Sequence, residues 1–361
     1  MNDANELISF IASMSGEGSL RVEENLGEGY VRLRVSEAER RQAKHDIQHV
    51  EDIVIEMLRN ARDAGADKVY LATTKEEGVR TLLFLDNGSG VPQDMQERIF
   101  DARVTSKLES MKMDRWGVHG RGMALFSIKQ NTDEARVVTS GVDLGSAFKV
   151  CVDTDRLGER TDQSSWPQAV KGEDGRYVCA RGPHNIIRAA CEFALEELRD
   201  CDVYLGSPSE IAATLYAQAS SRLDTSRLLF IDDECELPVI DRLGLASDAE
   251  DFIRICSGLG LEMSERTAHR ILSGQIKPVR GVCARLLRER DSTSHLPAPV
   301  DLAKDRRGLR IAKDDMAQFS RAVERDFNDL AARYYLNLCG DPKIRVSRDR
   351  ITVTFDLAKE E

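Results

Sequence analysis

The spacing of apolar positions predicts a first unit of strands and helices, from about residue 19 to 155. The stretches "GYVRLRV" (29–35), "KVYLATT" (68–74) and "VRTLLFLD" (79–86) have the apolar content of strands, and residues 36–64 have the apolar spacing of one long helix. A glycine-rich stretch, a helix near 120–131 and two antiparallel strands, "EARVVTSG" and "SAFKVCVDT", follow. This order predicts an α+β fold, a two-layer sandwich with helices on one face of a mixed sheet.

The remainder of the chain is predicted to be mostly helical. Residues 156–182 are rich in polar and turn residues, which indicates a linker or irregular segment. Next come a helix at 182–198, a strand "CDVYLG" and a helix that starts with Ser207, Pro208 and Glu210, a capping box with proline in the first turn. A helix near 313–338 and a closing hairpin end the chain. We therefore expect three parts: 1–155, 156–182 and 183–361, the last of unknown role.

Residues 247–276 predict two helices around a glycine turn, capped by Ser247 with Glu250 and by Ser264. This spacing resembles a helix-turn-helix unit, and basic residues follow it. An ordinary helical hairpin with a solvated basic face explains the same pattern and is preferred because the chain is acidic. DNA binding is a secondary hypothesis. The basic residues are Lys277, Arg280, Arg285, Arg288 and Arg290.

The long helix has a polar stripe as regular as its apolar one. Its apolar stripe is expected to pack on the sheet, whereas Glu56, Asn60 and Asp63 share a different face at spacings of four and three. Taken alone, such a stripe is most simply a solvated helix surface. The apolar stripe consists of Val50, Ile53, Val54, Met57, Leu58 and Ala61.

Two glycine-rich stretches raise a second interpretation. Asp86 ends an apolar strand and is followed by Asn-Gly-Ser-Gly. The two glycines have no Cβ atom, so a ligand can approach the backbone closely. The Asp86 carboxylate could then accept a hydrogen bond from the exocyclic amine of adenine. In "WGVHGRGMALFSI" (116–128), glycines precede an apolar helix, so free N–H groups and the helix dipole suit a phosphate chain. Each stretch alone is weak, since the first is also an ordinary turn.

The order and spacing of the three motifs are specific. E-x-x-x-N-x-x-D-A at 56–64, D-x-G-x-G at 86–90 and G-x-x-G-x-G at 117–122 together resemble the nucleotide site of the GHKL superfamily, which includes DNA gyrase, heat-shock chaperones, histidine kinases and MutL. The segment "RVTSKLES" (103–110) is similar to the Thr-Ser-Lys segment of the MutL-type ATP lid. The resemblance covers roughly residues 30–155, implies the Bergerat-type ATP-binding fold and, in motif form, is nearest to the MutL-like branch.

The resemblance implies a role for each matching residue. Glu56 matches the general base that activates water against the γ-phosphate, and Asn60 matches the ligand of a phosphate-bound Mg²⁺. Asp86 matches the adenine-reading carboxylate, with Asp63 as its support. Ser146, after Gly145, stands where the family has threonine. The implied backbone and lid positions are Gly88 and Gly90 beneath the base, Thr105, Ser106 and Lys107 in the lid, and Gly117, Val118, His119, Gly120, Arg121, Gly122 and Met123 around the phosphates. For Lys107, an exposed loop lysine is equally expected.

Charge and composition narrow the function only a little. The chain is 41% hydrophobic and 31% charged, with a net charge of −11, which argues against a protein that coats nucleic acid non-specifically. The eight cysteines are scattered singly, without metal-ligand spacing, so we expect reduced thiols. With no apolar run long enough to span a bilayer and no signal peptide pattern, a cytoplasmic protein is expected.

The expected function is that of a Mg²⁺-dependent ATPase that switches conformation for a protein partner or for self-association. The alternative is a kinase of the histidine-kinase or anti-sigma type that uses the same ATP site. His45 and His49, on the helix of Glu56, are expected to be partly exposed helix residues and not phospho-acceptors. A third interpretation keeps ATP as a structural ligand only. In gyrase and MutL the second domain supplies a lysine to the γ-phosphate, and no position here can be nominated for it, which puts efficient hydrolysis in doubt.

Overall fold

The structure is a computed structural model that divides into two compact units, Met1–Arg290 and Asp291–Glu361, each considered by itself. This division has no boundary at residue 155 or 182, where the sequence predicts them. Strands from before and after these residues pair in one sheet, and helices from both parts pack on it. The structure describes residues 22–106, 112–114, 117–119, 122–172, 175–198, 200–223, 233–291, 313–331, 336–340, 342–346 and 351–359.

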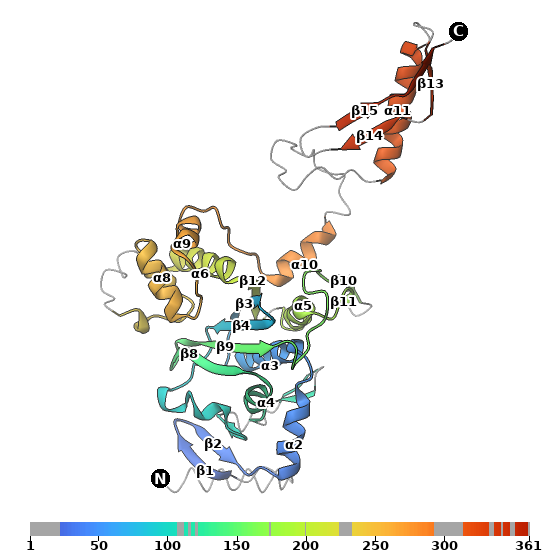
Figure 1. The fold of residues 1–361 in the computed structure, drawn as a ribbon. Helices are drawn as coiled ribbons and strands as arrows, with labels where there is room; N and C mark the ends of the chain where they lie inside the picture. Colours follow the sequence, from blue (N-terminus) through green and yellow to red (C-terminus); the bar gives the residue numbers. More distant parts are fainter. Residues whose placement is uncertain are drawn as a thin grey trace. The chain divides into compact units, whose positions relative to one another are not determined.

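The first unit is built on a five-stranded mixed sheet (Figure 1). Its first strand in the sheet order, β12, pairs parallel with β3, and every other neighbouring pair is antiparallel. The strand β12 comes from well beyond the segment expected to carry the ATP site. In sheet order the strands are β12 (Asp202–Gly206), β3 (Lys68–Glu76), β4 (Val79–Asp86), β9 (Gly145–Asp153) and β8 (Glu134–Gly141).

Helices cover one face of this sheet, as the α+β prediction requires. Val69, Leu71, Leu82 and Phe84 point to this face, because side chains alternate along a strand. Together with helix residues such as Ile53 they form one hydrophobic core, and α3 also packs against α5. On this face, the expected packing of helices on a mixed sheet is confirmed. Its helices are α3 (Val50–Asp63), α4 (Ala124–Asn131), α5 (Ile186–Glu196) and α10 (Val282–Asp291).

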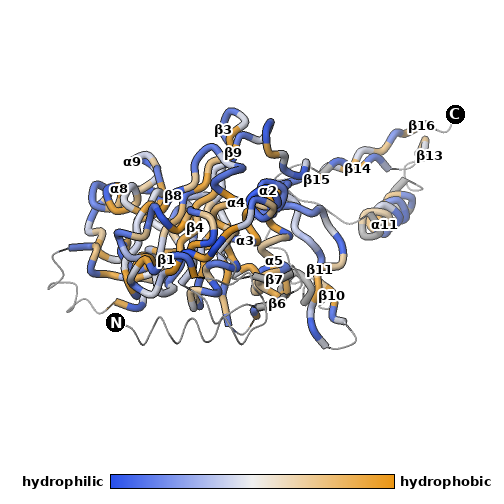
Figure 2. Tube along the Cα trace, turned by 90° about the horizontal axis from the view of Figure 1, so that it is seen from below, coloured by the Kyte–Doolittle hydropathy of each residue, from blue (hydrophilic) through white to orange (hydrophobic). Residues whose placement is uncertain are grey.

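A further helical layer covers the opposite face of the sheet. The intervening strand residues Tyr70, Ala72, Leu83 and Leu85 are buried in a second core with residues of α6, α8 and α9. Figure 1 shows these helices on the side of the sheet away from α3, and Figure 2 shows hydrophobic stretches gathered around β4. The C-terminal region is therefore helical, as expected, but it also covers the second face of the five-stranded sheet. The helices are α6 (Pro208–Arg222), α8 (Ala249–Gly258) and α9 (Glu265–Leu272).

The predicted single helix over 36–64 is wrong in one respect: it is two helices, α2 (Glu37–Asp46) and α3. Ile47 is extended, and the Asp52 carboxylate accepts hydrogen bonds from the Gln48 and His49 amides, both at 2.9 Å. These two amides therefore donate to a side chain in the first turn of a new helix. The apolar stripe of α3 is buried as expected, whereas Ala43 is the buried residue of α2.

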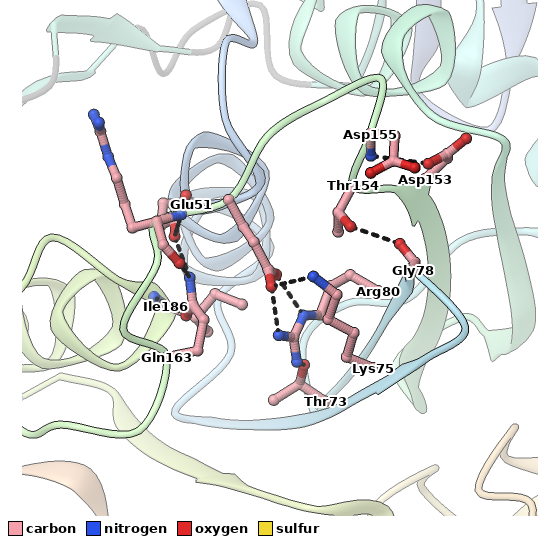
Figure 3. A network of polar contacts seen from close by, with 12 residues as sticks. Glu51, Thr73, Lys75, Gly78, Arg80, Asp153, Thr154, Asp155, Gln163 and Ile186 are labelled. Carbon is pink, nitrogen blue, oxygen red and sulfur yellow. Dashed lines mark hydrogen bonds and ion pairs between the residues drawn. The ribbon is translucent and has the colours of Figure 1, made fainter.

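The segment expected to be an irregular linker is tied to the sheet and to two helices (Figure 3). Glu159 accepts from Arg80 Nε at 2.8 Å and from Lys75 Nζ at 2.9 Å, and hydrogen bonds from these groups outweigh burial to lower the pKa of its carboxyl. Gln163 bridges Glu51 on α3 and the Ile186 amide that begins α5. The segment also contains a hairpin of β10 (Gln168–Lys171) and β11 (Tyr177–Arg181). The sequence does not predict this hairpin, because the segment is rich in turn residues.

Three expected helix starts can be compared with the structure. The capping box of α6 is present, since Ser207 and Glu210 bind each other's backbone amides. The cap of α8 is Asp248, whose carboxylate accepts from the Asp251 amide at 2.9 Å, and not Ser247, whose hydroxyl binds the Asp251 side chain instead. Ser264 caps α9 as predicted.

Short elements surround one end of the α3 face. The strands β1 (Val22–Gly27), β2 (Tyr30–Leu33) and β5 (Val104–Thr105) form a small antiparallel sheet, over a core of Tyr30, Val91, Met95, Ile99, Phe100 and Val104. The remaining short elements are η1 (Gln93–Met95), η2 (Arg98–Phe100), β6 (Lys112–Asp114), β7 (Gly117–His119), η3 (Glu234–Glu236) and η4 (Arg242–Leu245).

Among its described residues, the second unit has one helix and two antiparallel strand pairs, of which β14 with β15 is the predicted closing hairpin. Phe327 on the helix stacks on Phe355, with ring centroids 4.0 Å apart. Its elements are α11 (Lys313–Ala331), β13 (Leu336–Leu338), β14 (Lys343–Val346), β15 (Ile351–Thr354) and β16 (Leu357–Lys359). Within the described part of the whole chain, no helix is both long and apolar enough to cross a membrane.

Candidate functional site

A cavity of about 520 Å³ lies between α3 and the sheet. The strands β4 and β9 contribute Phe84, Asp86, Ser146 and Phe148, which share one sheet face because their positions are two apart. The helix α2, the segment 103–106 and the start of α4 complete the walls. The lining residues are Tyr30, Glu39, Gln42, Asp46, Ile47, Glu56, Met57, Arg59, Asn60, Ala61, Asp63, Ala64, Phe84, Asp86, Ser89, Val91, Ile99, Arg103, Val104, Thr105, Ser106, Gly122, Met123, Ala124, Leu125, Ser127, Ser146 and Phe148.

The polar stripe of α3 faces this cavity. Glu56, Asn60 and Asp63 all line it, so the solvated-surface interpretation of the stripe does not hold. The Glu56 carboxylate accepts from Arg59 Nη1 at 2.6 Å, and its side chain is 22% exposed, against 3% for Arg59. A carboxylate that is partly exposed and bonded to a buried guanidinium is held in one orientation, as a general base requires.

Asp63 is connected to a residue outside the motifs. Its carboxylate accepts from Arg62 Nε at 2.9 Å, and Arg62 Nη1 donates to Glu197, beyond the end of α5, at 3.0 Å. The Asp63 side chain is only 2% exposed. Arg62 therefore ties the cavity wall to the segment between α5 and β12, which is one reason why the nucleotide motifs and the C-terminal region form one unit.

Asp86 ends β4 at the floor of the cavity, directly opposite Ser146 on β9. It is buried, and its carboxylate accepts from the Gly88 amide at 2.8 Å. The Ser146 hydroxyl contacts the Ser140 hydroxyl at 2.9 Å, and Ser140 also accepts from the Val91 amide. These bonds hold the strand ends together beneath the cavity.

The predicted glycines are required by close backbone packing. Gly88 does not line the cavity, but a Cβ there would lie 2.9 Å from Ala64 and 3.1 Å from the Asp86 carboxylate. Gly90 has a φ of +68°, and a Cβ would lie 1.8 Å from the Gly141 carbonyl oxygen. A side chain at either position would push the strand end that carries Asp86 out of place.

The expected phosphate loop and lid are described only in part. Thr105, Ser106, Gly122 and Met123 line the cavity. Gly117, Val118 and His119 form β7, paired with β6, so the backbone expected to be an open loop is partly a strand here. Lys107, Gly120 and Arg121 lie outside the described residues.

Several lining residues were not anticipated. Glu39, Gln42 and Asp46 come from α2, which the motif comparison does not reach, and Arg59, Arg103 and Ser127 lie between or beside motif positions. The three positions on α2 follow a helical spacing of three and four, which is the signal that could have identified a second cavity wall. Arg103 is adjacent to the lid motif, but its burial, 2% exposed, cannot be inferred from a polar loop.

The cavity can accommodate a nucleotide with Mg²⁺. Its size suits a cofactor-sized ligand, and apolar side chains such as Met57, Phe84 and Phe148 can contact a base. Within the described residues, no group of three or more His, Cys, Asp or Glu side chains could hold a metal ion by itself, so a metal here would need further ligands such as an amide oxygen, water or phosphate oxygens. The lining carboxylates are Glu39, Asp46, Glu56, Asp63 and Asp86, and the described lining cations are Arg59 and Arg103.

Comparison with known proteins identifies relatives of the segment around this cavity. Residues 47–156 match the family model described as histidine kinase-, DNA gyrase B- and HSP90-like ATPase. The chain is 35% identical over 107 residues to the DNA mismatch repair protein MutL of Brucella abortus, which covers 29% of this chain and 17% of that protein. It is 32% identical over 100 residues to MutL of Thermodesulfovibrio yellowstonii and 34% over 113 residues to MutL of Staphylococcus aureus. The chain thus matches less than a fifth of the length of these curated relatives.

Proposed function

Because residues 47–156 are an ATP-binding domain of the GHKL superfamily, similar to that of MutL, we propose that this protein hydrolyses ATP with Mg²⁺ and changes its conformation as it does so. The observation that supports the proposal most is that Glu56, Asn60, Asp63, Asp86 and Ser146, which come from separate motifs, line one cavity. A hydrolytic site needs a base, a metal ligand and a nucleotide-reading group within reach of one substrate.

In the proposed mechanism, Glu56 orients and deprotonates the water that attacks the γ-phosphate. Arg59, 2.6 Å from its carboxylate, holds that carboxylate in one orientation. Asn60, one turn along α3, would hold a phosphate-bound Mg²⁺ through its side-chain oxygen, and the ion would supply positive charge beside the phosphates. The amides that begin α4, at Gly122 and Met123, lie at the positive end of the helix dipole and bind phosphate oxygens.

The adenine end is proposed to lie at Asp86. This buried carboxylate accepts from the exocyclic amine, while Met57, Phe84 and Phe148 contact the faces of the base. Asp63 supports the same wall through Arg62, and Ser146 contributes a hydroxyl beside Asp86.

The test is to incubate the protein with γ-labelled ATP and to measure both free phosphate and labelled protein. Hydrolysis predicts phosphate release that needs Mg²⁺ and a nearly unlabelled protein. Stable label on the chain or on an added protein would instead support the alternative, a kinase of the histidine-kinase or anti-sigma type. Asn60→Ala is expected to lose the Mg²⁺-dependent part of ATP binding, and Mg²⁺-dependent binding equal to that of the unaltered protein would show that Asn60 is not a metal ligand.

The conformational change is proposed to act on a partner or on a second copy of this chain. The helix that carries Glu56 and Asn60 packs on α5, and α10 packs in the same core, so a shift of α3 on ATP binding would alter surfaces beyond the ATP-binding domain. We propose a cytoplasmic location. As functional parts, we keep residues 1–155 as the ATP-binding part, 156–182 as the segment that follows it, and 183–361 as a part of unassigned role.

DNA contact by the helix pair α8 and α9, within 247–276, stays a prediction. Arg266, His269 and Arg270 on α9 are exposed, but Glu265 is exposed beside them, and the Arg285 guanidinium is engaged by the Trp166 ring at 3.9 Å. Duplex DNA binding that weakens steeply with added salt is the expected result if this pair contacts phosphates. Failure to bind duplex DNA at low salt, with and without ATP, would exclude this role.

A further inference from the structure

Arg103 is a buried cation in the wall of the ATP cavity. Its side chain is 3% exposed, and its φ of +63° is one that residues other than glycine seldom adopt. Its amide donates to the Gly122 carbonyl at 2.8 Å, and its own carbonyl accepts from the Leu33 amide at 3.0 Å. The backbone of Arg103 is therefore fixed against the residues that begin α4, where a phosphate chain is proposed to bind.

The hydrogen bonds of the Arg103 guanidinium are incomplete. Its Nη2 is paired with the Glu39 carboxylate, while its Nε is buried and has no hydrogen-bond partner among the described residues. A second buried donor in the same cavity, the Ser127 hydroxyl on α4, likewise lacks a partner in the described part of the chain. Buried polar groups without partners are rare because each has lost its hydrogen bonds to water without replacement, so an acceptor at this place is expected in the functional state.

The two members of the Arg103–Glu39 pair differ in their access to water. The Glu39 side chain is 33% exposed, whereas that of Arg103 is 3% exposed. Burial alone would raise the pKa of the Glu39 carboxyl, but hydrogen bonds from Ser36 and the charge of Arg103 lower it below its usual value. A released Glu39 can be hydrated, but a buried guanidinium needs another anion in exchange.

We propose that Arg103 binds the phosphate chain of the nucleotide and that Glu39 holds its guanidinium until the nucleotide arrives. The inference rests on the proposed ATP site and adds to it a phosphate-binding residue and a competing carboxylate. Phosphate oxygens accept from both donors of an arginine fork, so the bound nucleotide would satisfy Nε as well as Nη2. The carboxylates that line the cavity outnumber Arg59 and Arg103, and Arg59 is engaged with Glu56. Arg103 is thus the described cation best placed to take the added negative charge.

The test is a double-mutant cycle with two probes, a non-hydrolysable ATP analogue with Mg²⁺ and adenosine, measured by calorimetry. Arg103→Gln should weaken binding of the ATP analogue by roughly tenfold or more and change adenosine binding by less than about twofold. Glu39→Gln should strengthen binding of the ATP analogue by about threefold or more, because the competing charge is removed. Glutamine keeps the capping role of Glu39 toward Ser36. In the Arg103→Gln background, Glu39→Gln should have no effect.

The matched control is Glu37→Gln, on the same helix but outside the cavity, with a side chain that is 72% exposed. It should leave both affinities unchanged. The gain expected for Glu39→Gln cannot arise from misfolding, so the cycle remains informative if Arg103→Gln is unstable. Weaker or unchanged analogue binding by Glu39→Gln, or equal losses of adenosine and analogue by Arg103→Gln, would overturn the inference while leaving the ATP site intact. If the unaltered protein binds neither probe, the proposed ATP site itself is wrong, and this inference falls with it.

Discussion

Replacing Glu56 by glutamine should leave ATP bound and slow its hydrolysis by roughly a hundredfold or more. The substitution removes the proton acceptor but keeps a carbonyl oxygen that can accept from Arg59, now 2.6 Å from the carboxylate. Because the Arg59 side chain is only 3% exposed, Glu56→Ala would leave a buried guanidinium without this partner and lower stability as well. The two variants together separate loss of chemistry from loss of packing.

The measurements are single-turnover phosphate release and equilibrium binding of ATP, with thermal unfolding as a check on the fold. We expect both variants to lose turnover and Glu56→Gln alone to keep the unfolding temperature. Undiminished phosphate release by Glu56→Gln would show that another group activates the water. Equal loss of ATP binding in Glu56→Gln and Asn60→Ala would make Glu56 a structural residue.

Replacing Asp86 by asparagine should abolish most ATP binding while the protein stays folded. The asparagine oxygen can still accept from the Gly88 amide, which the carboxylate now binds at 2.8 Å. Its amide nitrogen would then face the adenine amine, donor against donor, at a position that is only 4% exposed. A buried unsatisfied donor costs up to about 3 kcal/mol, which is roughly a hundredfold in affinity.

Calorimetric titration with ATP and with GTP would measure this effect. The unaltered protein should prefer ATP, and Asp86→Asn should lose that preference together with its affinity. The control is Asp133→Asn, a carboxylate outside the cavity that pairs with Arg156 near the protein surface, for which no change is expected. Retention of full ATP affinity by Asp86→Asn would exclude Asp86 as the adenine-reading group.

The grouping of site residues could be predicted because their motifs depend on local chain geometry. Glu56, Asn60 and Asp63 share a helix face through sequence spacing alone, and Asp86 lies at a strand end that its apolar pattern marks. These positions line one cavity, although their chemical roles remain predictions. The polar positions of α2 share a helical spacing, but placing them at the site also requires the helix break at Ile47, which the sequence does not indicate.

The second helical layer was missed although the strands indicate it. In "VYLA" and "LLFL" consecutive residues are apolar, which is typical of strands buried on both faces. A sheet with one solvated face would show alternation instead. Arg103 could not be recognised for a different reason: its burial depends on tertiary contacts with Glu39 and Gly122, and single-sequence reasoning treats an arginine in a polar loop as exposed.

The parallel pairing of β12 with β3 has a consequence for synthesis of the protein. Residues near 70 and 204 are neighbours in the sheet, so β3 has an unpaired edge until the later strand leaves the ribosome. Tyr70, Leu83 and Leu85 also remain uncovered until α6, α8 and α9 emerge. Domains tend to fold in the order of their synthesis. Here, the residues of the nucleotide motifs cannot reach their folded arrangement until most of the first unit has been synthesised. The nascent chain therefore exposes its most aggregation-prone surface while the family's motifs are already complete, and this interval is where we expect a chaperone to be needed.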